Sequence, residues 1–370
     1  MKKKSRRIIK VFLILIAILL VLWLIIIIIS KIRFKRDKAF LEEKGYSSLV
    51  SAGEYAVNVL SYGNENGKHR IIAMAGYGVP DSCITMRRMT AAIEKDNQMI
   101  FIDRAGYGIS DDTTQDMTVE NIVEAYRTAL KNAGIKAPYV LMPHSIGGVY
   151  ATYWESKYPD EIEAVAIIDG TELEEVSPDK QDDVYNEVVL YYRLVKCGLG
   201  GTGDLLLKHF LPPKDWLSDE EQKAEYAMTL MTYDSRALLS EIEQEYRNIN
   251  TAWDSIVTND IPKIYISTQY FTAEAIEAEG ILTDEMIDEL MNDRKVSKAE
   301  VPKSQDERRQ LALEDYLEIG RDYKERILLP YLEKLGSCEF VNLPGDHLIY
   351  EQKPDACGKI ILDFITKLDG

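Results

Sequence analysis

An uninterrupted apolar run near the start of the chain limits what this sequence can become. Residues 11–29 are nineteen consecutive uncharged residues, most of them Leu, Ile or Val. A helix of about 20 residues crosses the roughly 30 Å hydrocarbon core of a bilayer. The run is too long for the apolar part of a cleavable signal, and no small-residue cleavage site follows it. We therefore expect one membrane-spanning helix within a basic N-terminal unit, residues 1–38. The segment from Lys31 to about Gly53 would serve as a juxtamembrane linker.

Basic residues flank the apolar run on both sides. Six Lys or Arg residues precede it, and five more occur between residues 31 and 38, so the positive-inside rule has little bias to act on. A short basic N-terminus ahead of a single span usually stays in the cytoplasm. On that reasoning we expect a cytoplasmic N-terminus and a large domain outside the cytoplasm.

The remainder of the chain is acidic. Residues 39–370 hold 33 of the 44 basic side chains and 60 of the 61 Asp and Glu side chains. A domain this acidic repels phosphate backbones, which argues against nucleic-acid binding. Four Cys without a CxxC pair and four His argue against a disulfide scaffold or a metal centre. We expect no cofactor and no metal, and the sequence does not indicate an oligomeric state.

Short apolar β-rich runs alternate with helical patterns after the apolar run. Several of these runs are apolar throughout, as strands buried on both faces of a parallel sheet are. A clear helix follows Thr118, a good N-cap, and ends before Gly134. The order predicts an α/β domain over residues 39–370, with a mostly parallel central sheet flanked by helices. Strands are expected near residues 54–60, 70–75, 98–103, 139–142, 164–168, 263–267 and 338–342.

Two helical stretches interrupt this alternation. Residues from about 172 to 258 are long enough to form a helical lid, and they include a glycine-rich loop at 198–203. Residues from about 272 to 328 form a second, heavily charged insertion. Segments inserted above the carboxyl edge of a sheet often cover a site, although a plain surface excursion has the same pattern.

The strongest chemical signal is a serine at a strand-to-helix junction. Residues 139–148 read Tyr-Val-Leu-Met-Pro-His-Ser-Ile-Gly-Gly, a strand that runs through a tight turn into a helix. A serine in such a turn presents its hydroxyl above the sheet, near the positive end of the helix. The pattern is G-x-S-x-G with Pro143 in place of the first Gly. Ser145 is therefore a candidate nucleophile, although a serine that only caps a helix would look similar.

Together with three other motifs, this segment resembles the α/β-hydrolase superfamily, in its lid-bearing serine hydrolase branch. The resemblance covers roughly residues 54–170 and 260–368. In family order, the motifs are the oxyanion loop at 73–78 with Ala75 in the usual His place, the D-x-x-G-x-G-x-S turn at 103–110, the elbow at 144–148, and the histidine loop Gly345-Asp346-His347.

The resemblance implies a Ser-His-acid triad. Ser145 would attack a carbonyl carbon, and His347 would take its proton and later protonate the leaving group. Backbone N–H groups of Tyr77 and Ile146 would hold the oxyanion. His144 would be a packing residue.

The acid of the triad is the least determined member. The usual family position, after the strand at 263–267, offers no Asp or Glu before Glu274. The alternative family position ends the preceding strand and holds Asp169, which we expect to be the acid. Glu274 and Glu172 stay open as alternatives.

These features predict a membrane-anchored serine hydrolase that cleaves a carboxylic ester, thioester or amide of a small or lipid-like molecule through an acyl-enzyme. Serine at the elbow argues against dehalogenase chemistry, for which the family uses Asp there.

Two alternatives remain. One is an aminopeptidase similar to proline iminopeptidase, whose lid carboxylates would hold a substrate amine; the candidates are Glu174, Glu175, Glu241, Glu243 and Glu245. The other is an inactive hydrolase fold that serves as a binding or sensing module at the cell envelope. Pro143, Ala75 and the undetermined acid favour that second reading, and an intact Ser145 and His347 oppose it.

Overall fold

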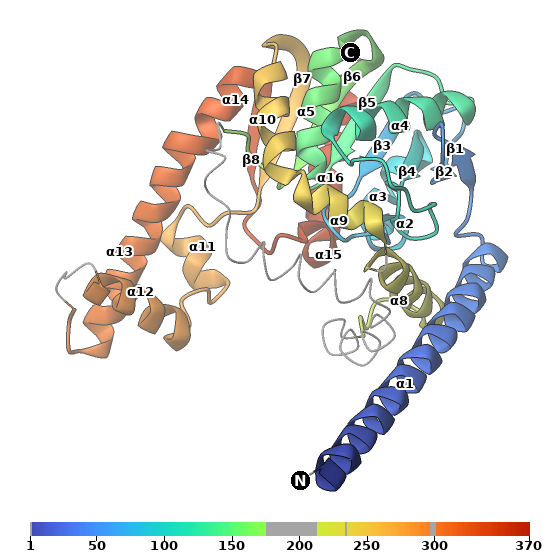
Figure 1. Cartoon of the computed structure of the whole chain (residues 1–370). Helices are drawn as coiled ribbons and strands as arrows, with labels where there is room; N and C mark the ends of the chain where they lie inside the picture. The colour runs from blue at the N-terminus through green and yellow to red at the C-terminus, as the bar shows by residue number, and fades with distance from the viewer. Residues whose placement is uncertain (1, 175–212, 234, 297–300) are drawn as a thin grey trace.

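An eight-stranded sheet forms the centre of the computed structural model, which describes residues 2–174, 213–233, 235–296 and 301–370 (Figure 1). The spatial order is β1-β2-β4-β3-β5-β6-β7-β8. Strands β1 and β2 are antiparallel to their neighbours, whereas all pairs from β4 to β8 are parallel. The strands are β1 (Leu49–Ser51), β2 (Ala56–Gly63), β3 (Arg70–Met74), β4 (Gln98–Ile102), β5 (Tyr139–Pro143), β6 (Ile162–Ile168), β7 (Asn259–Ser267) and β8 (Gly336–Asn342).

The predicted α/β fold with a mostly parallel sheet is confirmed, and each of the seven expected strands is present. The structure has one further strand, β1, which the sequence did not indicate. It has three residues and pairs only with β2 at the edge of the sheet, so it offers too few positions for a periodic pattern.

Alternate residues of each central strand pack into two separate hydrophobic cores, one on each face of the sheet, because successive side chains of a strand point to opposite faces. Ile72 and Met74 of β3 pack beneath α4 (Val119–Asn132), α5 (Gly147–Lys157) and α10 (Glu245–Ser255). Ile71 and Ala73 pack on the other face, with α8 (Asp219–Tyr233) and α16 (Pro354–Lys367). Burial on both faces explains why these strands are apolar throughout. The short helices are α2 (Ser82–Thr85), α3 (Arg87–Thr90), α9 (Arg236–Glu243), α14 (Leu329–Leu335) and α15 (Ile349–Gln352).

The helix expected after Thr118 is α4. The Thr118 hydroxyl accepts a hydrogen bond from the backbone N–H of Asn121, which satisfies one of the free donors at the helix start. Gly134 follows the helix with a φ of 75°, a conformation that glycine adopts without steric cost.

The first expected insertion, at about 172–258, is described only in part, because residues 175–212 and the glycine-rich loop at 198–203 lie outside the described residues. Its last helix, α10, packs beside α5 and α4 and so covers the sheet. The second insertion forms α11 (Ala273–Ala278), α12 (Asp284–Val296) and α13 (Gln305–Tyr323). These three helices lie to one side of the sheet around a small apolar cluster of their own (Figure 1).

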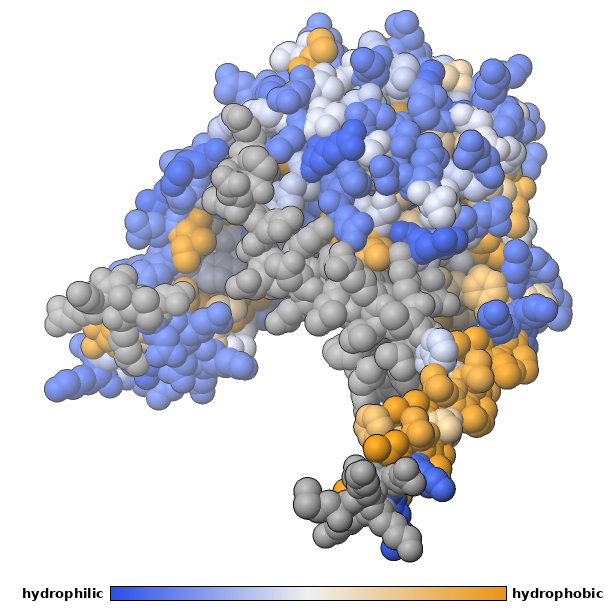
Figure 2. Space-filling model, in the orientation of Figure 1, coloured by the Kyte–Doolittle hydropathy of each residue, from blue (hydrophilic) through white to orange (hydrophobic). Residues whose placement is uncertain are grey.

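The N-terminal apolar run belongs to one long helix, α1 (Lys2–Glu43). Within the described residues, it is the one helix long and apolar enough to cross a membrane, and its apolar side chains from residue 8 to residue 25 are exposed (Figure 2). The helix continues through the first part of the expected linker and ends at Glu43 against the domain, and the last part of that linker contains β1. There Leu41 is fully buried, and the adjacent Lys44 ammonium lies 2.6 Å from a carboxylate oxygen of Glu220 on α8.

The buried end of α1 yields a stability prediction. Leu41→Ala should lower the free energy of unfolding by about 2–5 kcal/mol, because it leaves a cavity in a packed core. Leu20→Ala, in the exposed part of the same helix (52 % exposed), should leave it nearly unchanged. Urea unfolding of the protein in a non-ionic detergent measures both, and equal effects would mean that the end of α1 is not packed on the domain.

The D-x-x-G-x-G-x-S turn after β4 is fastened to β2 through Asn58. The Asn58 side-chain amide donates to the Asp103 carboxylate at 3.0 Å, and the Asn58 backbone N–H donates to the Ser110 hydroxyl at 2.9 Å. Gly106 has a φ of 74°, and a Cβ there would lie 2.5 Å from the Ser235 hydroxyl oxygen. Burial raises the pKa of Asp103 from 3.8 to about 7, against the opposing effect of the Asn58 hydrogen bond.

This raised pKa predicts a pH-dependent stability. Between pH 4 and pH 7 the folded protein holds a proton on Asp103 that the unfolded chain has lost. Relative to Asp103→Asn, the wild type should therefore lose stability as the pH rises from 4 to 7, and should lose no more above that range. Urea midpoints across this window test it, with Asp96→Asn, an exposed position, as the control. A difference in urea midpoint between wild type and Asp103→Asn that stays constant from pH 4 to pH 7 would contradict the expectation.

Candidate active site

Ser145 lies in a strained turn between β5 and α5. Its φ is 55°, a backbone conformation that non-glycine residues seldom adopt, and surrounding contacts hold it there. The Ser145 carbonyl accepts hydrogen bonds from the N–H groups of Gly148 and Thr171. A Cβ at Gly147 would lie 2.5 Å from the Met74 carbonyl oxygen, so glycine is needed where the new helix passes β3. This is the geometry of a nucleophile elbow.

Pro143 occupies the last position of β5, opposite Met74 in the parallel register. The next residue, His144, donates its backbone N–H to the Met74 carbonyl at 2.9 Å. The departure from the family pattern therefore leaves the connection between β5 and β3 in place.

His347 and Asp169 come together from the ends of different strands. The Nδ1 atom of His347 lies 2.6 Å from the Asp169 carboxylate, and the other carboxylate oxygen accepts the Thr268 backbone N–H at 3.0 Å. Burial alone would raise the pKa of Asp169. The hydrogen bonds from His347 and Thr268 outweigh burial and hold that pKa below its ordinary value, so Asp169 stays ionised. Its side chain is 10 % exposed, whereas that of His347 is 55 % exposed.

The two other carboxylates considered for this role lie elsewhere. Glu172 accepts hydrogen bonds from the hydroxyls of Tyr265 and Tyr323. Glu274 lies in the first turn of α11 and is exposed. The structure brings only Asp169 of the three to the His347 ring.

His144 does more than fill space. Its Nε2 donates to the His347 backbone carbonyl at 2.9 Å, and the centroids of the two rings are 4.6 Å apart. Burial, followed by the nearby His347, lowers the pKa of His144 to about 4, so its ring is neutral at ordinary pH. A neutral ring with this donor holds the histidine loop against the elbow.

Tyr77 and Ile146, the residues expected to supply oxyanion donors, lie on the loop after β3 and directly after Ser145. Their backbone N–H groups have no hydrogen-bond acceptor among the described residues. Two such N–H groups at an elbow are available to a ligand oxygen.

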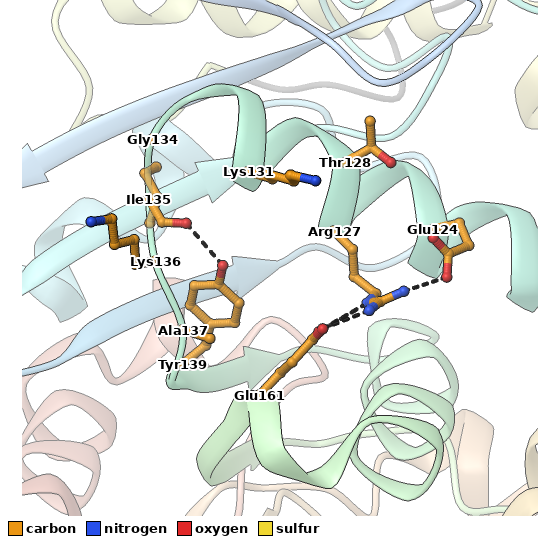
Figure 3. Close-up of a pocket in the computed structure, with 10 residues that line it drawn as sticks. All are labelled: Glu124, Arg127, Thr128, Lys131, Gly134, Ile135, Lys136, Ala137, Tyr139 and Glu161. Atoms are coloured by element: carbon orange, nitrogen blue, oxygen red, sulfur yellow. Dashed lines mark hydrogen bonds and ion pairs between the residues drawn. The ribbon is translucent and has the colours of Figure 1, made fainter.

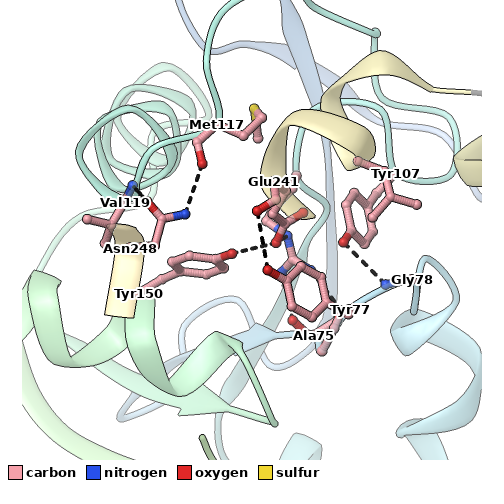
Figure 4. A network of polar contacts seen from close by, with 12 residues as sticks. Ala75, Tyr77, Gly78, Tyr107, Met117, Val119, Tyr150, Glu241 and Asn248 are labelled. Atoms are coloured by element: carbon pink, nitrogen blue, oxygen red, sulfur yellow. Dashed lines mark hydrogen bonds and ion pairs between the residues drawn. The ribbon is translucent and has the colours of Figure 1, made fainter. Parts of the chain in front are cut away.

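A buried arginine, Arg104, holds the loop that carries Tyr77. Figure 4 shows the polar network around its partner Glu241. The Arg104 guanidinium donates to the carbonyls of Ala75 at 2.6 Å and Gly76 at 2.7 Å, and its Nε lies 2.8 Å from the Glu241 carboxylate. Both side chains of this ion pair are almost completely buried. The Tyr150 hydroxyl from α5 donates to the same carboxylate at 2.5 Å.

This network was not expected from the sequence. Arg104 stands inside the D-x-x-G-x-G-x-S turn, which was its only signal, and its partner Glu241 comes from α9, far along the chain. Glu241 was among the lid carboxylates considered for a substrate amine, but its burial and its pairing with Arg104 remove it from that role. Glu175, another of those carboxylates, lies outside the described residues.

Ser145 and His347 line one cavity of about 410 Å³. In the described part of the chain, no hydrogen bond joins the Ser145 hydroxyl to the His347 ring; such contacts often tighten only when substrate binds. Among the same residues, no group of three or more His, Cys, Asp or Glu side chains is arranged to hold a metal ion.

A second cavity, of about 500 Å³, lies where α4 ends and β5 begins (Figure 3). Arg127 spans it, with Glu161 on one side and Glu124 on the other. Tyr139 begins β5, whereas Ser145 follows its carboxyl end, so this cavity is at the opposite edge of the sheet. Its described lining contains no nucleophile paired with a base.

Comparisons with solved structures agree with this fold. An epoxide hydrolase, CorEH, is 14% identical over 87% of this chain and 98% of its own, with a TM-score of 0.58. The haloalkane dehalogenase DbeA from Bradyrhizobium elkani is 15% identical over 87% and 98% of the two chains, with a TM-score of 0.53. At such identities the likeness concerns the fold alone.

Curated relatives match over shorter segments. Uncharacterized protein YbdG of Bacillus subtilis is 35% identical over 159 residues, which are 43% of this chain and 48% of the relative. An uncharacterized vacuolar membrane protein of Saccharomyces cerevisiae is 23% identical over 141 residues, 34% of this chain and 22% of the relative. The chain thus spans less than half the length of these relatives.

A family model described as alpha/beta hydrolase fold matches residues 76–270, from the oxyanion loop to the segment after β7. This range contains the elbow at Ser145 and the strand end at Asp169. With the sheet order and the structural neighbours, it settles the family: the chain belongs to the α/β-hydrolase fold family.

Proposed function

We propose that this protein is a membrane-anchored serine hydrolase that cleaves a carboxylic ester, with a thioester or an amide as the next candidates. One observation carries the proposal. His347, hydrogen-bonded to Asp169 at 2.6 Å, lines the same cavity as Ser145, whose φ of 55° is that of a nucleophile elbow.

The reaction uses these groups in turn. The Ser145 oxygen attacks the substrate carbonyl carbon while the His347 imidazole takes the Ser145 proton. Asp169 orients the imidazole through Nδ1 and stabilises its charged form. The oxyanion is held by the N–H groups of Tyr77 and Ile146. His347 then protonates the departing alcohol, and a water activated by the same imidazole releases the acid from Ser145.

The hydrolase neighbours bear on the reaction only through their shared fold. DbeA is named as a haloalkane dehalogenase, and family members with that chemistry carry Asp at the elbow, where this chain has Ser145. A serine oxygen supports acyl transfer to and from the protein.

The proposed arrangement in the cell follows from α1. Residues 1–38 anchor the protein through a span at about 11–29, and residues 39–370 form the hydrolase domain with its two helical insertions. We place that domain outside the cytoplasm. A relative named as a vacuolar membrane protein is consistent with a membrane location.

Covalent labelling tests the nucleophile. A fluorophosphonate probe should label detergent-solubilised wild type, and both Ser145→Ala and His347→Ala should abolish labelling. Asp169→Asn should lower kcat for 4-nitrophenyl acetate by about 10³–10⁴-fold, because the imidazole loses its orienting charge. Ser156→Ala, on the same helix as the elbow, is the matched control and should label as wild type does.

Two results would contradict this assignment. A folded wild type that does not label would favour the alternative of an inactive binding or sensing module. Labelling that survives Ser145→Ala would identify a different nucleophile.

A second prediction concerns the ion pair behind the oxyanion loop. Arg104→Lys should lower kcat about tenfold or more with little change in KM, because a single ammonium cannot hold the carbonyls of Ala75 and Gly76 together with Glu241. Steady-state hydrolysis of 4-nitrophenyl acetate separates the two constants. Arg127→Lys, at the opposite edge of the sheet, is the control. A rise in KM with unchanged kcat would show that Arg104 serves substrate binding instead of the transition state.

A further inference from the structure

One end of the cavity that contains Ser145 is rich in charge. Among the described residues four charged ones line it, and we call this set the acidic end: Asp81, Lys214, Glu225 and Glu351. They come from the loop before α2, the segment before α8, α8 itself and α15. With all four ionised, three negative charges face one positive charge.

The single cation of the acidic end is already paired. The Lys214 ammonium lies 2.8 Å from a Glu225 carboxylate oxygen and 2.8 Å from a Glu351 carboxylate oxygen. Two carboxylate partners leave Lys214 little capacity to attract an anionic substrate. The same arrangement shows that carboxylates from different elements converge here on an ammonium group.

Asp81 is the member without a partner. Its side chain lines the cavity and the residue is only 6 % exposed, yet no other described residue donates a hydrogen bond to its carboxylate. A carboxylate buried to this extent is costly unless it is paired. Burial first, and then the charge of Glu225, raises the pKa of Asp81 to about 7. The nearby Lys214 ammonium, which is already paired with Glu225 and Glu351, opposes this rise only in part.

We propose that the acidic end is a substrate subsite for a primary ammonium group, held by Asp81 with Glu225 close by, while Ser145 acts on the carbonyl of the same molecule. This inference rests on the proposed function of Ser145 and adds the class of substrate: an ester or amide that carries an amine. Tyr233 and Tyr350 line the same cavity, and aromatic faces attract ammonium groups.

The subsite differs from the lid carboxylates considered from the sequence. Glu241 lies in the Arg104 network, whereas Asp81 and Glu351 belong to loops and helices of the main domain and flank the oxyanion and histidine loops. The amine would therefore be held by Asp81, next to the oxyanion loop, while the first insertion contributes Glu225 through α8.

Isosteric ester pairs test the subsite. The pairs are the 4-nitrophenyl esters of 6-aminohexanoic and heptanoic acid, and of β-alanine and butanoic acid, in which an ammonium replaces a methyl group. For wild type, kcat/KM should be about tenfold or more higher for the ammonium member of at least one pair. Asp81→Asn and Glu225→Gln should remove most of that preference and change the hydrolysis of the neutral esters less than twofold. Asp219→Asn, an exposed carboxylate at the start of α8, is the control and should keep the preference.

A binding measurement that does not depend on catalysis tests the subsite separately from the proposed role of Ser145. Hexylammonium and hexan-1-ol are titrated calorimetrically into Ser145→Ala and into Ser145→Ala with Asp81→Asn. Tighter binding of hexylammonium that depends on Asp81 supports the subsite even if wild type neither labels nor hydrolyses esters. Equal binding of the two compounds, or a wild type that labels but prefers the neutral esters, overturns the subsite and leaves the role of Ser145 intact.

Discussion

The buried ion pair between Arg104 and Glu241 is the contact on which the site depends. Arg104 follows β4, yet its guanidinium holds the carbonyls of the loop after β3, while its partner lies on α9 and also binds Tyr150 of α5. One charged group thus fixes four elements relative to one another. Removing either partner would leave an uncompensated charge in the interior, which is far more costly than the pair itself is stabilising.

Two buried carboxylates of this protein have pKa values shifted in opposite directions, because different groups surround them. Asp169 accepts hydrogen bonds from His347 and Thr268 and remains ionised despite its burial. Asp103 accepts a hydrogen bond from the neutral amide of Asn58, which together with the Arg104 charge offsets burial only in part, and its pKa rises to about 7. Hydrogen-bond donors around a buried carboxylate therefore decide its protonation state more than the extent of burial does. An ionised carboxylate such as Asp169 can orient an imidazole, whereas a protonated one serves packing.

Much of the fold follows from local patterns. The parallel strands were predictable because burial on both faces makes them continuous apolar runs, and α4 was predictable from Thr118 and Gly134. Ser145 was marked by its strand-to-helix turn, and Asp169 was chosen because the resemblance to the α/β-hydrolases places an acid at that strand end. Contacts that join distant segments left no local signal. The pairing of Arg104 with Glu241, and the convergence of Asp81 with Glu225, depend on how α8 and α9 return to the sheet.

The continuity of α1 has a mechanical consequence. The helix runs without a break from the apolar span to Leu41, which is buried in the domain. The fourteen residues from Ser30 to Glu43 rise about 21 Å, at about 1.5 Å per residue. In the proposed membrane-anchored arrangement, such a rigid helix would hold the hydrolase-fold domain at a set height and tilt over the bilayer, whereas a flexible linker would leave both variable. Molecules at that height would meet the site at a high local concentration, and those at other depths would have to leave the lipid to reach it.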